Sequence, residues 1–435
     1  MIDLYVKILI SISIVSFILS ISACSNEPPQ TSEPLTRGLY VWQRQWNEDV
    51  RESITKTGQS SPSIQSLIVL AAEISFENGI PKTIKCDLDH QILLDSGVPI
   101  GLALRIGPYS GPFESDDEVA TLISELSREI VTESLEHGIP VSELQIDFDC
   151  PDSKLDGYRV WINAIREKID PVSVTITALP SWLYQKGFDK LVKSTDGFVL
   201  QVHSLEAPES PDSEFTLCDT ERSMEWIDLA AKSGVPFRVA LPTYGYVLAF
   251  DKDGKFIGLS AEGPSLDWPD DVQLRTVRSD PVDLADFVGR LETDHPALLS
   301  GIIWYRMPVE GDRLNWTWPT LLVVMDGRKP APMLKVEALQ TSPGLIDIRL
   351  TNNGDLPESG DIEVDISWEN AHLIAFDMLR GVRVNETADN GMRIVRQSSD
   401  DISGDPVMPG QSVIIGWLRF ETDKFVNVDV SIAPR

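Results

Sequence analysis

The segment LQIDFDCPDSK, residues 144–154, places two carboxylates at a spacing that could do chemistry. Gln145, Asp147 and Asp149 alternate with apolar residues in it, and this period of two predicts a strand that presents all three polar side chains on one surface. When two carboxylates lie close together, the pKa of one rises, so one can hold a proton while the other stays charged. The pair is therefore a candidate for general acid–base catalysis.

The spacing of the pair narrows the chemistry. Asp147 and Asp149 are two residues apart, which is roughly 6.5 to 7 Å along a strand. Carboxylates about 5 to 9.5 Å apart perform glycoside hydrolysis in many enzymes. Glu73, near the carboxyl end of another predicted strand, is a further candidate as nucleophile or base. We therefore name Asp149, Asp147 and Glu73 as candidate catalytic residues.

The elements that must position these carboxylates repeat eight times along residues 37–325. Short apolar runs begin near residues 37, 64, 98, 143, 172, 197, 236 and 300 and alternate with longer stretches that have helical periodicity. Eight strands joined by helix-sized connections over about 290 residues are typical of an α/β fold of the (β/α)8 TIM-barrel type. A doubly wound sheet is the rival, but no GxGxxG follows the first strand. We predict a barrel domain over residues 37–330.

Beyond residue 330 the pattern changes to short, strictly alternating strands separated by Gly, Pro and Asn turns. This pattern predicts an all-β sandwich of about 100 residues over 331–435. LTNNGDLP and MPGQSVIIGWLRF resemble strands and turns of immunoglobulin- or fibronectin-like modules. Since no chemistry-bearing residues gather there, we expect an accessory or spacing domain.

The alternation in the barrel strands predicts which side chains face the barrel axis. In strand order the predicted inward set is Tyr40, Trp42 and Arg44; Glu73; Arg105; Gln145, Asp147 and Asp149; Thr175 and Thr177; Gln201 and His203; Tyr244; and finally Trp304 and Arg306. Barrel interiors are normally packed with Val, Ile and Leu, and an unpaired polar group there costs several kcal/mol. Polar residues near the carboxyl ends of so many strands therefore indicate a binding site.

Aromatic residues beside carboxylates at a barrel mouth are suited to stacking on sugar rings. We expect Trp42 and Trp304 to stack in this way and Arg105 to position charge. The residues expected to hold hydroxyl or amide groups of a substrate are Gln145, Gln201, His203, Tyr244 and Arg306. Structural alternatives stay open: Arg105 and Asp147 could be an ion pair that closes the barrel, His203 a core histidine, and the aromatic residues simple core.

The amino terminus predicts export and anchoring. The apolar run ILISISIVSFILSIS is shorter than the about 20 residues of a membrane-spanning helix and ends in ISAC. This ending resembles the lipobox of bacterial lipoproteins, which implies a signal peptide over 1–23, lipidation of Cys24 and a tether over 24–36. We expect a lipid-anchored protein of the cell envelope, at the outer membrane and facing the periplasm or the surface. The alternative is an ordinary secretory signal with an incidental cysteine.

Composition excludes several classes of partner. The net charge of −30 opposes binding to nucleic acid and to an anionic membrane surface through protein charge. A neutral polymer such as a glycan fits better. The chain has four cysteines and five histidines, with no CxxC spacing, so we expect no cofactor and no structural metal. The three cysteines besides Cys24 can form at most one internal disulfide.

Several long motifs in order resemble a known bacterial family. They are RGLYVWQRQW, LQIDFDCPDSK, ITALPSWL, LQVHSLE and VALPTYGY, and the family they resemble is domain of unknown function 3142. The resemblance implies a glycoside-hydrolase-like barrel lipoprotein without an established activity. More loosely, the fourth strand is similar to the DxxDxDxE motif of glycoside hydrolase family 18. On that pattern Ser142, Gln145, Asp147 and Asp149 fall at the four acidic positions, so that two acids are replaced and an aspartate stands where the acid glutamate belongs.

The leading hypothesis is an exported lipoprotein that binds and hydrolyses a glycan, with Asp149 as general acid and Asp147 as the partner that sets its pKa. The alternative is a non-catalytic glycan-binding or envelope-assembly lipoprotein, which the missing glutamate favours. Acyl or peptide hydrolysis would need a GxSxG elbow or a Ser/His pair, and the sequence shows neither. Metal-assisted hydrolysis through Asp147, Asp149 and His203 stays open.

Overall fold

The computed structural model describes residues 33–60, 63–114, 117–204, 208–261, 268–269, 271–397 and 406–433. The expected signal peptide, the lipidation site Cys24 and most of the expected tether lie outside these residues. Contacts divide the chain into the units Met1–Glu33 and Pro34–Arg435, and the second contains all the elements below. Within the described part, none of the helices has the length and apolarity needed to span a membrane.

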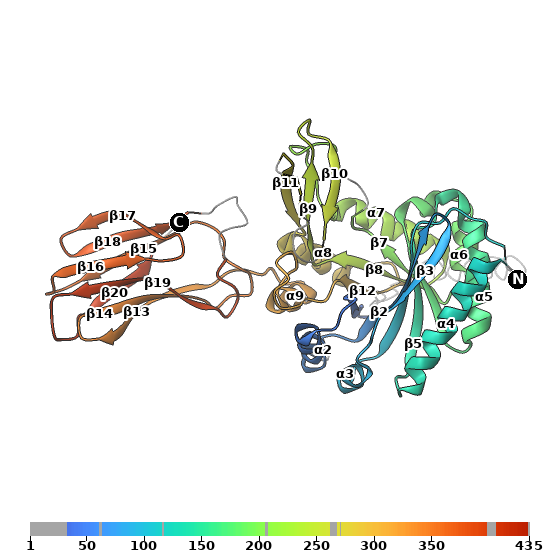
Figure 1. Ribbon diagram of the computed structural model, residues 1–435, viewed down its shortest axis with the longest axis horizontal. Coiled ribbons are helices and arrows are strands. Elements are labelled where there is room, and N and C mark those ends of the chain that lie inside the picture. The colour runs from blue at the N-terminus through green and yellow to red at the C-terminus, as the bar shows by residue number, and fades with distance from the viewer. Residues whose placement is uncertain are drawn as a thin grey trace, which may run out of the picture. The chain divides into compact units, whose positions relative to one another are not determined.

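Eight parallel strands close into a barrel (Figure 1). They are β1 (Thr36–Val41), β2 (Ser66–Glu77), β4 (Ile100–Ile106), β5 (Val141–Phe148), β6 (Ser173–Ala178), β7 (Gly197–Gln201), β8 (Phe237–Pro242) and β12 (Leu299–Tyr305). The order β1-β12-β8-β7-β6-β5-β4-β2 returns to its start because β1 also pairs with β2. A short strand, β3 (Ile80–Lys85), adds to β2 as an antiparallel hairpin. All eight expected strands are present, and the predicted (β/α)8 fold class is confirmed.

Helices connect the strands around the outside of the barrel (Figure 1). They are α2 (Glu48–Gln59), α3 (His90–Asp95), α4 (Glu118–Glu136), α5 (Leu155–Ile169), α6 (Phe188–Val192), α7 (Thr220–Ala230), α8 (Pro281–Thr293) and α9 (Trp318–Met325). Many begin at a side chain that accepts a backbone N–H of the first turn, namely Asn47, Asp89, Asp117, Asp219, Asp280 and Thr317. Such caps satisfy donors that the helix itself cannot pair.

The layer between strands and helices holds the main hydrophobic core and fixes which way β5 faces. Ile146 and Phe148 are buried in it, and the Phe148 ring lies 5.1 Å from that of Tyr158 and 5.4 Å from that of Trp161, both on α5. Because alternate residues of a strand point to opposite faces, burying these two outward sends Asp147 toward the barrel axis.

A three-stranded antiparallel sheet is inserted between β8 and α8. It consists of β9 (Gly245–Phe250), β10 (Phe256–Ser260) and β11 (Gln273–Arg278), with β9 in the middle. We did not expect this sheet from the sequence, where its first strand merges with the apolar run of β8.

The C-terminal part contains two four-stranded antiparallel sheets. One has the order β13 (Leu334–Ser342), β14 (Leu345–Asn352), β19 (Ser412–Phe420), β16 (Leu373–Met378), and the other β17 (Arg383–Ala388), β18 (Gly391–Arg396), β15 (Ile362–Trp368), β20 (Val428–Ile432). Their alternate apolar residues form a separate core in which Trp368 packs edge-on against Phe420. Strictly alternating strands that share a core are what the sequence predicted, whereas the domain boundary at residue 330 stays a prediction.

Candidate active site at the carboxyl end of the barrel

Three neighbouring barrel strands carry charged residues in register. Glu73 of β2 pairs with Arg105 of β4, and Arg105 pairs with Asp147 of β5. Residues paired in a parallel ladder point to the same face, so a cationic side chain stands between two carboxylates at one level of the barrel. The carboxyl ends of the strands, where this row lies, are where TIM-barrel enzymes place their active sites.

A cavity of about 230 Å³ opens beside this row. Most of the sequence-predicted residues line it: Trp42, Arg105, Gln145, Asp147, Asp149, Gln201, His203 and Tyr244. Residues that the sequence-based site set did not include also line it, namely Tyr40, Thr177, Ser204, Ala240, Tyr246, Ala261 and Tyr305. Three predicted site residues, Glu73, Trp304 and Arg306, are not part of this lining. Strand alternation thus brings together side chains from β1, β4, β5, β6, β7 and β8.

Asp147 has the electrostatics of a proton-holding group. Burial, and after it the nearby charge of Asp149, raises the pKa of its carboxyl to about 6, against the opposing effects of Arg105 and of a hydrogen bond from Thr177. Burial also raises the pKa of Asp149, which Arg105 opposes, although Asp149 is more exposed than Asp147. Two carboxyl groups with raised pKa values beside one cation are suited to sharing a proton.

Glu73 lies in the same row, and its carboxylate is paired with two arginines. Its carboxylate accepts two hydrogen bonds from Arg44, with Nε–Oε2 at 2.5 Å and Nη2–Oε1 at 3.0 Å, and Arg105 Nη1 lies 3.9 Å from Oε1. Arg105 forms its ion pair with Glu73 and not with Asp147, the structural alternative that the sequence left open. Glu73 is therefore placed to hold two guanidinium groups at the cavity rim.

A buried amide lies beneath the carboxylates. Gln145 is 0% exposed, and its Nε2 donates to the hydroxyl groups of Tyr40, at 2.7 Å, and Thr177, at 2.9 Å. Its Oε1 is buried without a hydrogen-bond partner among the described residues, and so is Nε1 of Trp42, which also lines the cavity. An unsatisfied buried polar group is costly, so a ligand that offers both a donor and an acceptor would be stabilised here.

Hydroxyl groups cluster on the opposite wall. The Ser204 Oγ lies 2.5 Å from the Tyr244 hydroxyl and 2.9 Å from that of Tyr246, and the two tyrosine hydroxyls are 2.9 Å apart. Ser204 has a φ of 58°, a conformation that a non-glycine residue adopts only where its surroundings impose it. His203 Nδ1 lies 3.4 Å from the Tyr244 hydroxyl, and burial lowers the pKa of His203 to about 3. This wall is polar, and His203 in it is uncharged at neutral pH.

Aromatic rings surround the cavity on the side of β1 and β12. The Trp42 ring lies 5.5 Å from those of both Tyr40 and Tyr305, in edge-on arrangements. The Tyr305 ring also stacks on His203, with ring centres 5.6 Å apart. An aromatic wall that faces a pair of carboxylates provides apolar area together with a few directed polar groups, as small-molecule sites usually do.

The prediction that Trp304 faces the barrel axis is wrong. Trp304 is 0% exposed and packs in the outer core against Trp316, with ring centres 5.8 Å apart. The register explains this placement: Trp304 pairs with Leu39, which faces the helices, so both point outward. The residue that β12 brings to the cavity is Tyr305.

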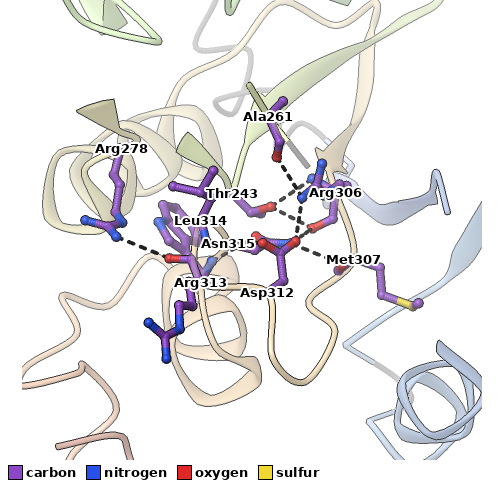
Figure 2. A network of polar contacts seen from close by, with 10 residues as sticks. Thr243, Ala261, Arg278, Arg306, Met307, Asp312, Arg313, Leu314 and Asn315 are labelled. Carbon is purple, nitrogen blue, oxygen red and sulfur yellow. Dashed lines mark hydrogen bonds and ion pairs between the residues drawn. The ribbon is translucent and has the colours of Figure 1, made fainter. Parts of the chain in front are cut away.

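Arg306 is buried and does not line the cavity, and Figure 2 shows its guanidinium in contact with Asp312 and Ala261. Its Nη2 donates to Asp312 Oδ2 at 2.5 Å and to the carbonyl oxygen of Ala261 at 3.1 Å. Its backbone exchanges hydrogen bonds with the hydroxyl of Thr243, and its carbonyl also accepts from Asn315. These contacts hold the loop after β12 in place, and the expected substrate contact of Arg306 is not supported.

An inward-facing ion pair escaped sequence analysis. Glu143, two residues before Gln145 on β5, accepts hydrogen bonds from both Nη atoms of Arg238 on β8, at 2.6 and 2.5 Å, and from Thr175 at 2.6 Å. Both ions face the axis nearer the amino ends of the strands than the carboxylate row. The alternation of β5 and β8 already contained this signal, because Glu143 is in phase with Gln145 and Arg238 with Ala240.

The described residues contain no group of His, Cys, Asp and Glu side chains that could hold a metal ion. The His203 ring contacts Ser204, Tyr244 and Tyr305. These contacts do not place it beside Asp147 and Asp149 as a third metal ligand. Cys86, Cys150 and Cys218 are free thiols. The polar groups that line the cavity are carboxylates, amides and hydroxyls, together with the Arg105 guanidinium and the His203 imidazole.

Comparison with solved structures finds similar chains at low identity. The spore cortex-lytic enzyme SleL of Bacillus cereus is 12% identical, with a TM-score of 0.47, over 68% of this chain and 74% of its own. A chitinase of Chromobacterium violaceum is 12% identical, with a TM-score of 0.45, over 67% and 98%. The GH18 chitinase ChiB of Flavobacterium johnsoniae is 12% identical, with a TM-score of 0.44, over 68% and 94%.

Among curated proteins, none matches this chain. A family model does match it, over a stretch that runs from the loop before α4 to the loop after β12. Residues 112–310 match the family described as Domain of unknown function (DUF3142), and this match confirms the resemblance that the sequence motifs predicted.

Proposed function

We propose that the barrel binds a glycan in the cavity at its carboxyl end and hydrolyses a glycosidic bond there. The observation that carries the proposal is the pairing of Asp147, with a pKa raised to about 6, and Asp149 inside a cavity with an aromatic wall. One carboxyl that keeps its proton beside one that is charged is the arrangement that glycoside hydrolysis requires.

The roles follow from position. Asp149, the more exposed of the two and nearer the mouth, donates its proton to the glycosidic oxygen of the bond that breaks. Asp147, deeper in the cavity, passes the proton of the pair to Asp149 as Asp149 donates it, and the resulting Asp147 carboxylate stabilises the positive charge that develops on the sugar ring. Water then adds to the anomeric carbon and returns a proton to the pair. Arg105, beside both, limits how far either pKa rises.

The remaining lining supplies recognition. The unpartnered Trp42 Nε1 and Gln145 Oε1 offer a donor and an acceptor, which hydroxyl or amide groups of a sugar satisfy. Ser204, Tyr244 and Tyr246 add hydroxyl groups on the other wall. The rings of Trp42 and Tyr305 provide the apolar area on which a sugar ring packs, in place of the Trp304 expected from the sequence.

A screen of the purified chain on a glycan array, followed by incubation with each bound glycan and mass spectrometry of the products, tests this proposal. Asp149→Asn should lower turnover at least 100-fold, because general acid catalysis contributes about 10²- to 10⁴-fold, while glycan binding persists. Asp152→Asn is the matched control, since this exposed aspartate accepts hydrogen bonds from Ser181 and Gln185 and does not line the cavity. Unchanged turnover in Asp149→Asn would remove this residue from the acid's role.

A second function, glycan binding without hydrolysis, is favoured by one specific observation. Among the described residues, Asp147 and Asp149 are the carboxylates that line the cavity, since Glu73 is paired with arginines and the inward position before Asp147 is held by the amide of Gln145. If the array retains a glycan and mass spectrometry finds that glycan intact at every pH from 4 to 8, the protein binds glycans without hydrolysing them.

We also propose that the protein is exported and lipid-anchored in the cell envelope through Cys24. The apolar run that ends in ISAC and the polar, proline-rich stretch after it support this proposal. The protein would then attach to the membrane through the lipid on Cys24 and bind its glycan in the barrel cavity.

A further inference from the structure

A second cavity, of about 480 Å³, lies outside the site described above, and we call it the α7 cavity. It is formed by the segment that follows β7, the first turns of α7 and strand β11, and its lining includes Phe215, Leu217, Arg222, Trp226 and Arg275. The backbone N–H of Ser204, which lines the barrel cavity, donates to the carbonyl of Leu217 at 2.9 Å. The two cavities are therefore separated at this point by two hydrogen-bonded backbone segments.

Arg275 brings a positive charge into the α7 cavity and forms no ion pair with a carboxylate of the described residues, although Glu214 and Asp219 line the same cavity. Its side chain is partly buried, and Nη1 donates to the carbonyl oxygens of Pro211, at 2.9 Å, and Ser213, at 2.6 Å. These carbonyls hold the guanidinium in position but carry no charge. A partly desolvated cation whose hydrogen-bond partners are neutral favours an anionic ligand at short range, although the net charge of −30 opposes it at long range.

The rest of the lining suits a ring that carries hydroxyl groups. The guanidinium carbon of Arg222 lies 4.9 Å from the centre of the Trp226 ring, so a second cation covers a buried indole. Phe215 and Leu217 add apolar area. Glu214 and Asp219 place carboxylate acceptors at the same cavity.

A ligand must therefore combine one carboxylate with several hydroxyl donors and an apolar ring face. Arg275 attracts its carboxylate, the two acidic residues accept hydrogen bonds from its hydroxyl groups, and the aromatic rings pack against its ring. The volume lies in the range of small-molecule sites.

We infer that the α7 cavity binds a sugar acid, a hexuronate-type residue, and that it recognises an acidic unit of the glycan that enters the barrel cavity. The second clause rests on the proposed function, whereas the binding of the sugar acid does not.

Ligand-observed NMR titration of the whole chain with D-glucuronate, D-glucose and acetate tests this inference. Glucuronate should bind with a dissociation constant in the millimolar range, and glucose and acetate at least tenfold more weakly. Arg275→Gln should weaken glucuronate binding at least fivefold. Arg278→Gln is the matched control, because Arg278 lies on the same strand and does not line the cavity, and this variant should bind as the wild type does.

Phe215→Ala provides a second variant, since it shortens the cavity wall and leaves the hydrogen bonds of Arg275 untouched. It too should weaken glucuronate binding at unchanged thermal midpoint. Equal binding of glucuronate and glucose, equal competition by acetate, or the same loss in Arg278→Gln as in Arg275→Gln would each overturn the inference. If Asp149→Asn loses turnover but still binds glucuronate, the two sites are separate. If the wild-type chain cuts no glycan but binds glucuronate through Arg275, only the proposed function is contradicted.

Discussion

At the scale of single residues, Asp147 links the chemistry of the cavity to the stability of the fold. Its pKa is raised from 3.8 to about 6, chiefly by burial. Between these values the unfolded chain releases a proton that the folded chain retains, so the free energy of unfolding falls as pH rises through this window. The full difference is about 3 kcal/mol at roughly 1.4 kcal/mol for each pH unit, and solvent at the cavity reduces it to about 2.

Asp147→Asn, which is uncharged at every pH, should lack this fall. Relative to the wild type, the variant should gain about 2 kcal/mol of unfolding free energy between pH 4 and pH 8. Urea unfolding at the two pH values measures the difference, and the titration of other groups cancels in the comparison. Asp152→Asn should follow the wild type. Parallel pH dependence in Asp147→Asn and the wild type would contradict the raised pKa.

Sequence alternation predicted the core of the site but not its whole lining. The pattern of β5 predicted its three inward side chains, those of Gln145, Asp147 and Asp149. The prediction succeeds because Ile146 and Phe148 pack in the outer core and so fix which face of β5 points inward. Ser204 lies past the end of β7 with a left-handed backbone, where alternation no longer applies. Tyr246 lies on the inserted sheet, whose existence the apolar run of β8 conceals.

At the scale of elements, β12 shows why the phase of a strand buried on both faces is hard to predict. Its sequence, LSGIIWY, offers apolar residues at successive positions, so no polar face marks the side that meets water. Only the pairing with β1, which places Trp304 beside Leu39, decides the phase. The existence of the barrel strands was predictable because each apolar run is short and bounded by turn residues. Which side chains of a strand face the barrel axis, however, depends on pairing partners far away in the chain.

The Glu143–Arg238 pair makes a prediction about how β5 and β8 are held. Glu143 is 8% exposed and both its oxygens accept from Arg238, so Glu143→Gln leaves a buried guanidinium without its counter-charge. The variant should lose about 3 to 5 kcal/mol of unfolding free energy, measured by chemical denaturation. Glu143→Leu combined with Arg238→Met should lose less than the single change, since no charge then stays buried alone.

Glu136→Gln, at the exposed end of α4, is the control for the loss of one negative charge and should change stability by less than about 0.5 kcal/mol. A loss in Glu143→Gln no larger than that of the control would show that the pair is dispensable to the fold. A double variant less stable than Glu143→Gln would show that the interior needs these side chains for packing and not for charge balance.

At the scale of the whole molecule, net charge decides how the chain can meet a membrane. With a net charge of −30, protein charge is repelled by anionic lipid, so membrane attachment would depend on the acyl chains alone. Cys24→Ala should therefore move the protein from the membrane fraction to the soluble fraction, as followed by fractionation and immunoblotting. Washing the wild-type membranes with 1 M salt should release none of it, because no ionic attraction holds it there. Cys218→Ser, which alters a thiol of the barrel, should stay with the membrane; a Cys24→Ala protein that stays there too would contradict the lipoprotein proposal.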